Sequence, residues 1–147
     1  MMTPFVYPGI KLVAYTLWSY LALRYFRPQQ PDLLSRSLVY GFLRLLMGLF
    51  FGGVIFVAGL LILSVIGTGL PQNALTYVLI YVPVRWVEWS LMAALVVPGS
   101  FPFVWRVVGT SPEDRTWRLV GIIISCLADI PMIIAFGGVI PTGRILC

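Results

Sequence analysis

The chain has 147 residues, of which 60% are hydrophobic and only 10% are charged, and its mean hydropathy is +0.98. Soluble domains carry about 25% charged residues, so this composition excludes an ordinary water-soluble domain and predicts a membrane protein. The net charge of +5 does not indicate nucleic-acid binding, because the basic residues are scattered around apolar runs. We therefore expect the lipid bilayer, and no nucleic acid, among the partners.

Four apolar runs are long enough to cross the hydrocarbon core of a bilayer as helices, which takes roughly 20 residues. They extend from about Phe5 to Phe26, Leu38 to Ile66, Ala74 to Val97 and Leu119 to Ile140. Together they leave no room for a separate soluble domain. We predict an all-α polytopic membrane protein, in which residues 1–147 form a single membrane domain, a bundle of four transmembrane helices with short loops.

The fourth run follows a helix-start motif, so we expect its helix to begin outside the bilayer. In the stretch TSPED, Ser111 is the expected N-cap, Pro112 the first helical residue, and Glu113 and Asp114 occupy the first turn. One continuous helix should run from about Pro112 through the fourth run. The aromatic segment at residues 101–109 is too short to span a bilayer, and we expect it at the membrane interface.

The placement of arginine predicts the orientation, because cytoplasmic loops carry an excess of Lys and Arg. The first and third loops and their flanks hold six arginines: Arg24, Arg27, Arg36, Arg106, Arg115 and Arg118. The second loop holds no charge, and the chain ends contribute Lys11 and Arg144. We predict that loops 27–37 and 98–118 are cytoplasmic and that both termini lie outside, in a bacterial inner membrane.

Three charges, those of Arg85, Glu88 and Asp129, lie too deep in the predicted spans to reach the headgroups. All fall within roughly one helical turn of the bilayer midplane, where each costs at least about 2.5 to 3.5 kcal/mol. We therefore expect the three side chains to face inward and meet. Lys11 and Arg44 lie nearer to the ends of their spans and are expected to extend to the interface.

Helical spacing adds neighbours to these charges. Arg85 and Glu88 are three residues apart and are expected to pair, and Trp89 can offer an aromatic face to Arg85. On the fourth span, Ser125 and Cys126 lie four and three residues before Asp129, so helical spacing places them on the same face. The predicted midplane cluster, a candidate for binding or proton relay, comprises Arg85, Glu88, Trp89, Ser125, Cys126 and Asp129.

The charges of the predicted cluster sum to −1 if Arg85, Glu88 and Asp129 are all ionised. An unpaired carboxylate in a low dielectric takes up a proton, so we expect Asp129 to be protonated. Pro83 and Pro131 lie beside the charges and each leaves a backbone carbonyl without its usual partner. Interrupted helices of this kind form the midplane sites of transporters.

The second run carries glycines on one helix face, and two of them form a G-x-x-x-G motif. These residues are Gly41, Gly48, Gly52 and Gly59. Small residues let helix backbones approach closely, so we expect a helix-packing seam. Packing within the bundle is favoured over a homodimer face.

Histidine is absent, which excludes histidine metal sites, histidine-ligated haem and histidine acid–base catalysis. The two cysteines, Cys126 and Cys147, form no C-x-x-C motif, and we expect no structural disulfide between them. We predict no cofactor, no metal and no catalytic residue. An enzyme is the least favoured class, because the chain offers no nucleophile–base pair beyond Cys126 near Asp129.

Two classes of function stay open. The first is a non-catalytic membrane subunit or assembly factor, held to another membrane subunit or to a second copy of itself by the cluster and the glycine seam. The second is a small proton-coupled transporter, with Asp129 as the titrating group and Arg85 and Glu88 as the gate.

Overall fold

A computed structural model of the chain describes residues 6–67, 74–97 and 111–135. The helices are α1 (Val6–Phe26), α2 (Leu33–Ile66), α3 (Ala74–Val96), α4 (Pro112–Leu127) and α5 (Ile130–Ala135). The described residues form helices and no strand, which confirms the all-α class. The expected interfacial segment, residues 101–109, and the end of the fourth run, residues 136–140, lie outside the described residues.

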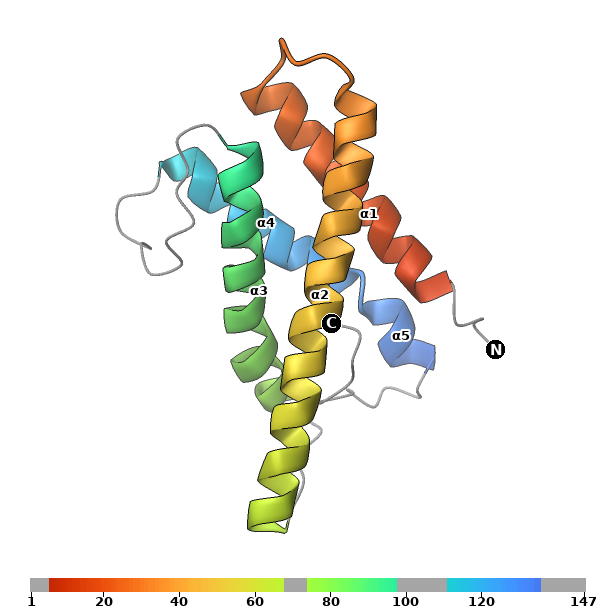
Figure 1. Ribbon diagram of the computed structural model, residues 1–147, viewed down its shortest axis with the longest axis vertical. Coiled ribbons are helices and arrows are strands. Elements are labelled where there is room, and N and C mark those ends of the chain that lie inside the picture. Colours follow the sequence, from red (N-terminus) through yellow and green to blue (C-terminus); the bar gives the residue numbers. More distant parts are fainter. Residues whose placement is uncertain (1–5, 68–73, 98–110, 136–147) are drawn as a thin grey trace.

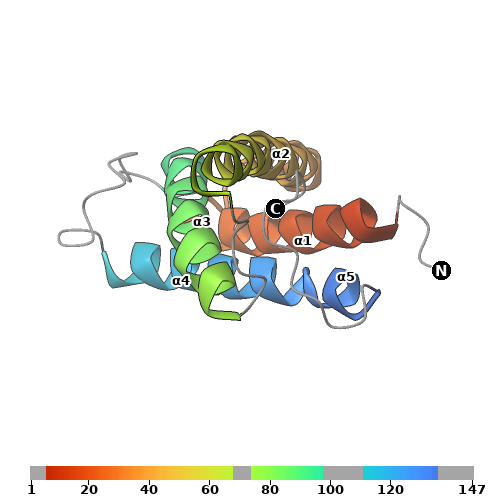
Figure 2. The ribbon, with the colours of Figure 1, turned by 90° about the horizontal axis from the view of Figure 1, so that it is seen from below.

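The four longer helices each contact at least two others, and α2 packs mainly along α1 while α4 packs mainly on α3. α1 and α4 run in opposite directions and are inclined to α2 and α3 (Figures 1 and 2). The end of α1, the start of α2, the end of α3 and the start of α4 gather at one end of the molecule (Figure 1). Consecutive long helices therefore alternate in direction.

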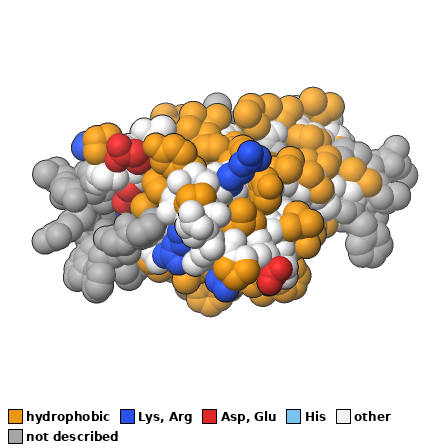
Figure 3. Space-filling view, turned by 90° about the horizontal axis from the view of Figure 1, so that it is seen from above, with side chains coloured by type: hydrophobic (Ala, Val, Ile, Leu, Met, Phe, Trp, Pro, Cys, Tyr) orange, Lys and Arg blue, Asp and Glu red, His pale blue; other side chains and the backbone are white. Residues whose placement is uncertain are grey.

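Charged side chains lie among hydrophobic ones at this end of the molecule, as Figure 3 shows. The exposed charged residues of the helices and turn that meet there are Arg24, Asp32, Arg36, Glu113 and Arg115. Cations predominate among them. The described ends of both basic loops therefore lie at the same end of the fold.

Three of the helices are long and apolar enough to cross a membrane: Leu33–Val65, Leu75–Val96 and Pro112–Ala135, among the described residues. They correspond to the second, third and fourth predicted runs. α1 has 21 residues but is not one of the three, because polar residues lower its hydropathy. Three of those polar residues, Lys11, Thr16 and Ser19, are buried inside the molecule.

α4 begins where the sequence predicts. Ser111 is its N-cap, and the side-chain oxygen of Ser111 accepts a hydrogen bond from the backbone N–H of Asp114 at 3.2 Å, with Pro112 as the first helical residue. The predicted continuous helix is interrupted at two residues: α4 ends at Leu127 and α5 begins at Ile130, and together they form the apolar helical stretch Pro112–Ala135. Pro131 explains the break, since it has no N–H to donate and its ring clashes with the carbonyl one turn earlier.

α2 is the longest helix, with 34 residues. At 1.5 Å per residue it measures about 51 Å, well beyond the roughly 30 Å of a hydrocarbon core. Its last turns project past the ends of the other helices (Figure 1). It ends at Gly67, whose φ of 75° is left-handed and whose N–H bonds to the carbonyl of Leu63 at 2.9 Å.

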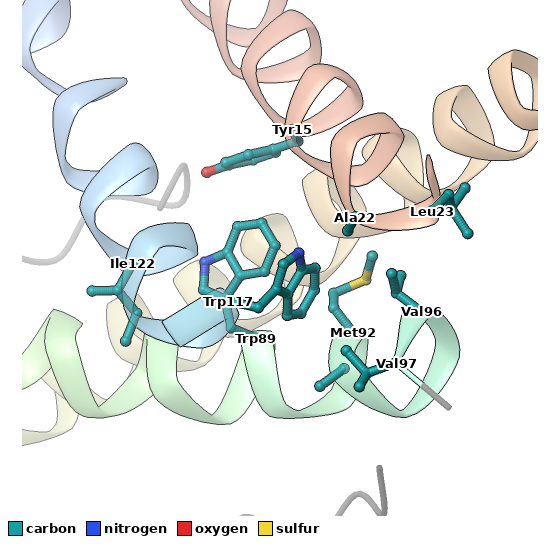
Figure 4. Close-up of a cluster of buried hydrophobic side chains, with 10 residues drawn as sticks. Tyr15, Ala22, Leu23, Trp89, Met92, Val96, Val97, Trp117 and Ile122 are labelled. Carbon is teal, nitrogen blue, oxygen red and sulfur yellow. The ribbon is translucent and has the colours of Figure 1, made fainter. Parts of the chain in front are cut away.

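A hydrophobic core lies between α1, α3 and α4 and is centred on two tryptophans (Figure 4). The ring centroids of Trp89 and Trp117 lie 5.1 Å apart in an edge-to-face arrangement, and the ring of Tyr15 lies 5.9 Å from that of Trp89. Gly121 lets α4 approach this core, because a Cβ there would lie 2.5 Å from the ring of Trp89. Aromatic packing therefore fixes α4 against α3.

The first glycine of the predicted seam brings α2 against α1. A Cβ on Gly41 would lie 2.9 Å from the backbone nitrogen of Thr16 and 3.0 Å from its Cα, distances too short to be relieved by moving a side chain. Gly48 and Gly52 are also buried, and Gly59 is half-buried. At Gly41 the seam serves packing inside the molecule.

We expect Gly41→Ala to lower the free energy of unfolding by about 1–3 kcal/mol, the usual cost of overpacking a closed interface. The measurement is thermal unfolding of the purified protein in detergent. Gly53→Ala is the matched control on the same helix, because a Cβ on Gly53 meets nothing within 4 Å. Equal melting temperatures of the two variants would contradict close α1–α2 packing at Gly41.

Candidate functional site

Asp129, between α4 and α5, is the centre of a buried network of ion pairs. Its Oδ1 lies 2.8 Å from Nζ of Lys11, and its Oδ2 forms a salt bridge with Arg85. The hydroxyl of Tyr7 donates to Oδ1 and the hydroxyl of Tyr77 donates to Oδ2, each at 2.6 Å. The carboxylate thus has four partners, which come from α1 and α3.

Glu88 on α3 pairs with Arg44 on α2, with 2.6 Å between Oε2 and Nη2. The guanidinium of Arg44 lies over two aromatic rings, 4.9 Å from the centroid of Tyr15 and 5.0 Å from that of Trp89. The hydroxyl of Ser125 accepts a hydrogen bond from the indole N–H of Trp89 at 3.0 Å and lies 3.5 Å from Nη2 of Arg44. This second pair therefore joins α2, α3 and α4.

Arg85 connects the end of α4 to the aromatic residues of α3. Its Nη1 donates to the hydroxyl of Tyr77 at 2.8 Å and to Sγ of Cys126 at 2.9 Å. Its guanidinium carbon lies 5.3 Å and 5.7 Å from the ring centroids of Tyr77 and Tyr81. Spacing of four residues places these two tyrosines and Arg85 on one face of α3.

The structure brings the six residues of the predicted cluster together, but the predicted pairing is wrong. Glu88 bonds to Arg44, and Arg85 bonds to Asp129. The ring of Trp89 accordingly faces Arg44 instead of Arg85. Pairing within α3 would leave Arg44 buried without an opposite charge and Asp129 with Lys11 alone, so pairing between helices is the arrangement that gives each buried cation a carboxylate.

Lys11 and Arg44 do not extend to the interface, contrary to expectation, since their side chains are 0% and 1% exposed. The reason for Lys11 is visible in the sequence. Tyr7, Lys11 and Tyr15 are four residues apart and therefore share one face of α1, and that face is buried. A tyrosine four residues before and another four residues after Lys11 is the sequence feature that indicates an inward-facing lysine.

Arg118, one of the six arginines assigned to the cytoplasmic loops and their flanks, is also buried. Its Nε and Nη2 donate to the two oxygens of Asp114 at 2.8 Å and 2.7 Å, and its Nη1 donates to the hydroxyl of Ser90 at 2.9 Å. Asp114 lies one helical turn before Arg118 in the first turn of α4. This pair fixes the start of α4 to the end of α3.

The network carries an excess of positive charge. Three cations, Lys11, Arg44 and Arg85, face the two carboxylates of Glu88 and Asp129, which leaves a net charge of +1. The sequence predicted −1, because Lys11 and Arg44 were assigned to the interface. With two cations on Asp129, the reason to expect a protonated carboxyl there no longer holds.

Among the described residues, no group of three or more His, Cys, Asp or Glu side chains could hold a metal ion. Cys126 is a free thiol, and Cys147 lies outside the described residues. Comparison with protein-family models, with curated proteins and with solved structures finds no significant match to this chain.

We expect Glu88→Gln to lower the free energy of unfolding by about 3–5 kcal/mol, because it leaves the buried guanidinium of Arg44 without its counter-charge. Thermal unfolding in detergent measures the loss. Glu113→Gln is the control, since Glu113 is exposed in the first turn of α4 and its neutralisation should lower the melting temperature far less than Glu88→Gln does. The double variant Arg44→Met/Glu88→Met leaves no unpaired charge of this pair and should unfold at a higher temperature than Glu88→Gln. A lower unfolding temperature for the double variant than for Glu88→Gln would contradict a buried ion pair between Arg44 and Glu88.

Proposed function

We propose that the protein is a non-catalytic integral membrane subunit that crosses the bilayer four times, with α1 as the span that hydropathy alone does not identify. α1 is about 31 Å long at 1.5 Å per residue, close to the thickness of a hydrocarbon core. Its outer face is apolar, with Val13, Leu17 and Leu21 exposed. Lys11, Thr16 and Ser19 are buried, and the exposed polar residues Arg24 and Tyr25 lie in its last turn, where the headgroups would be.

The observation that carries the proposed role is that Glu88 and Asp129 are each held by cations from other helices. Asp129 joins the end of α4 to α1 and α3, and Glu88 joins α3 to α2. A titrating carboxylate in a carrier must exchange its partners during transport. Releasing Asp129 would break two ion pairs and two hydrogen bonds at once, which favours a structural lock over a proton-coupled carrier.

The far part of α2 supports an assembly role. Among its last turns Val57, Leu60, Leu61 and Val65 are exposed, and so is Phe56. An upright helix of this length would carry apolar side chains past the hydrocarbon core into water. A second membrane subunit packed along this segment would cover them. We propose that the ion pair between Arg44 and Glu88 holds α2 rigid for that contact.

The proposed orientation, with loops 27–37 and 98–118 in the cytoplasm, can be tested with single cysteines. In a chain carrying Cys126→Ser and Cys147→Ser, Gln29→Cys should react with a membrane-impermeant maleimide only when the cytoplasmic side is open. Asn73→Cys should react from the outside. Labelling of both positions from the same side would contradict four alternating spans.

The proposed role predicts that the purified chain alone drives no pH-dependent flux in proteoliposomes. In mild detergent it should instead run as an assembly larger than one chain, as measured by light scattering or native mass spectrometry. Asp129→Asn should reduce the yield of that assembly together with thermal stability. A flux that the chain supports by itself, and that Asp129→Asn abolishes while folding stays intact, would identify a carrier instead.

A further inference from the structure

An open groove lies between the last turns of α1 and the first turns of α4, at the basic end of the molecule. Its volume is about 600 Å³, within the range of pockets that hold small organic molecules, and most of its lining is hydrophobic. Four of the lining side chains are aromatic: Trp18, Tyr25 and Phe26 from α1, and Trp117 from α4. None of the described lining residues belongs to the buried ion pairs, so the groove is separate from the buried network.

Glu113 makes the groove selective for a cation. It lies in the first turn of α4, and it is the one charged residue among the described residues that line the groove. Its side chain is exposed, so the carboxylate is available to a ligand. A carboxylate and several aromatic rings around one groove bind an ammonium group by charge and by cation–π contact. The hydrophobic part of the lining fits hydrocarbon, so the ligand should combine an ammonium group with an apolar chain.

The position of the groove indicates that the bilayer supplies this ligand. In the proposed four-span arrangement the end of α1 and the start of α4 lie at the level of the headgroups, where aromatic residues are enriched in membrane proteins. Arg24 and Arg115 are exposed, and they directly precede two lining residues, Tyr25 and Thr116. Both signs of charge therefore occur at this end, which suits a headgroup that carries a phosphate beside an ammonium group.

We propose that the groove binds one ethanolamine phospholipid, whose ammonium group lies between Glu113 and the aromatic rings and one of whose acyl chains lies along the hydrophobic lining. This site rests on the proposed crossing of the bilayer by α1 and α4, and it is independent of the subunit role. Cysteine labelling from the two sides tests the crossing. A chain with the expected topology and no lipid selectivity would therefore count against the groove alone.

The test is native mass spectrometry of the purified chain in detergent, titrated with phosphatidylethanolamine or phosphatidylglycerol that carry the same acyl chains. We expect the chain to retain one ethanolamine lipid more tightly than the glycerol lipid, which has no ammonium group. Glu113→Gln should weaken the ethanolamine-lipid affinity about tenfold, the usual effect of losing a hydrogen bond to a charged group, and leave the glycerol-lipid affinity unchanged. Asp32→Asn is the matched control, because Asp32 is exposed at the same end, makes no side-chain capping bond and does not line the groove.

Thr116→Phe tests the groove by filling it, since Thr116 is an exposed lining residue, and it should abolish the preference for the ethanolamine lipid. Leu119→Phe is its control, at a residue of the same helix that is 53% exposed and does not line the groove. Equal affinities of the wild type for the two lipids would overturn the proposal, and so would equal ethanolamine-lipid affinities of Glu113→Gln and Asp32→Asn. Occupation of the groove by detergent, by a second copy or by another part of the chain would make Thr116→Phe and Leu119→Phe retain lipid alike, which would also overturn it.

Discussion

The arrangement of the helices depends on the compensation of buried charge at Asp129. A carboxylate in a low-dielectric interior is tolerated only when cations and hydrogen-bond donors surround it. Asp129 obtains Lys11 and Tyr7 from α1, and Arg85 and Tyr77 from α3. It lies between α4 and α5, where the chain leaves the helical path.

Local rules of the sequence predict much of the fold. The N-cap at Ser111 and the end of α3 at Val96, one residue before the predicted boundary, follow from capping and hydrophobic length. The two prolines show the limit of such rules. Pro83 lies inside α3 without interrupting it, whereas Pro131 coincides with the break after α4. Both remove one backbone hydrogen bond, and only packing against other helices decides whether the helix continues.

The pairing of the charges could not be derived from spacing. Spacing shows that Arg85 and Glu88 share a face, and it says nothing of which neighbouring helix approaches that face. The sequence nevertheless contained a usable signal in the four-residue spacing of Tyr7, Lys11 and Tyr15. Tyrosine repeated beside a cation indicates a buried polar face, because the hydroxyl offers hydrogen bonds and the ring offers cation–π contact. Hydropathy averages, which count Lys11 only as a cost, miss this pattern.

The ion pairs join residues far apart in the chain, and this has a consequence for biosynthesis. In the proposed four-span arrangement Lys11 enters the membrane with α1, whereas the carboxylate that it contacts belongs to Asp129, which follows α4. Arg44 on α2 likewise precedes its partner Glu88 on α3, by 44 residues. In that arrangement the buried cations would wait for their counter-ions until translation delivers the later helices. A chain whose translation stops before α4 would leave Lys11 uncompensated within the bilayer, at a cost of several kcal/mol.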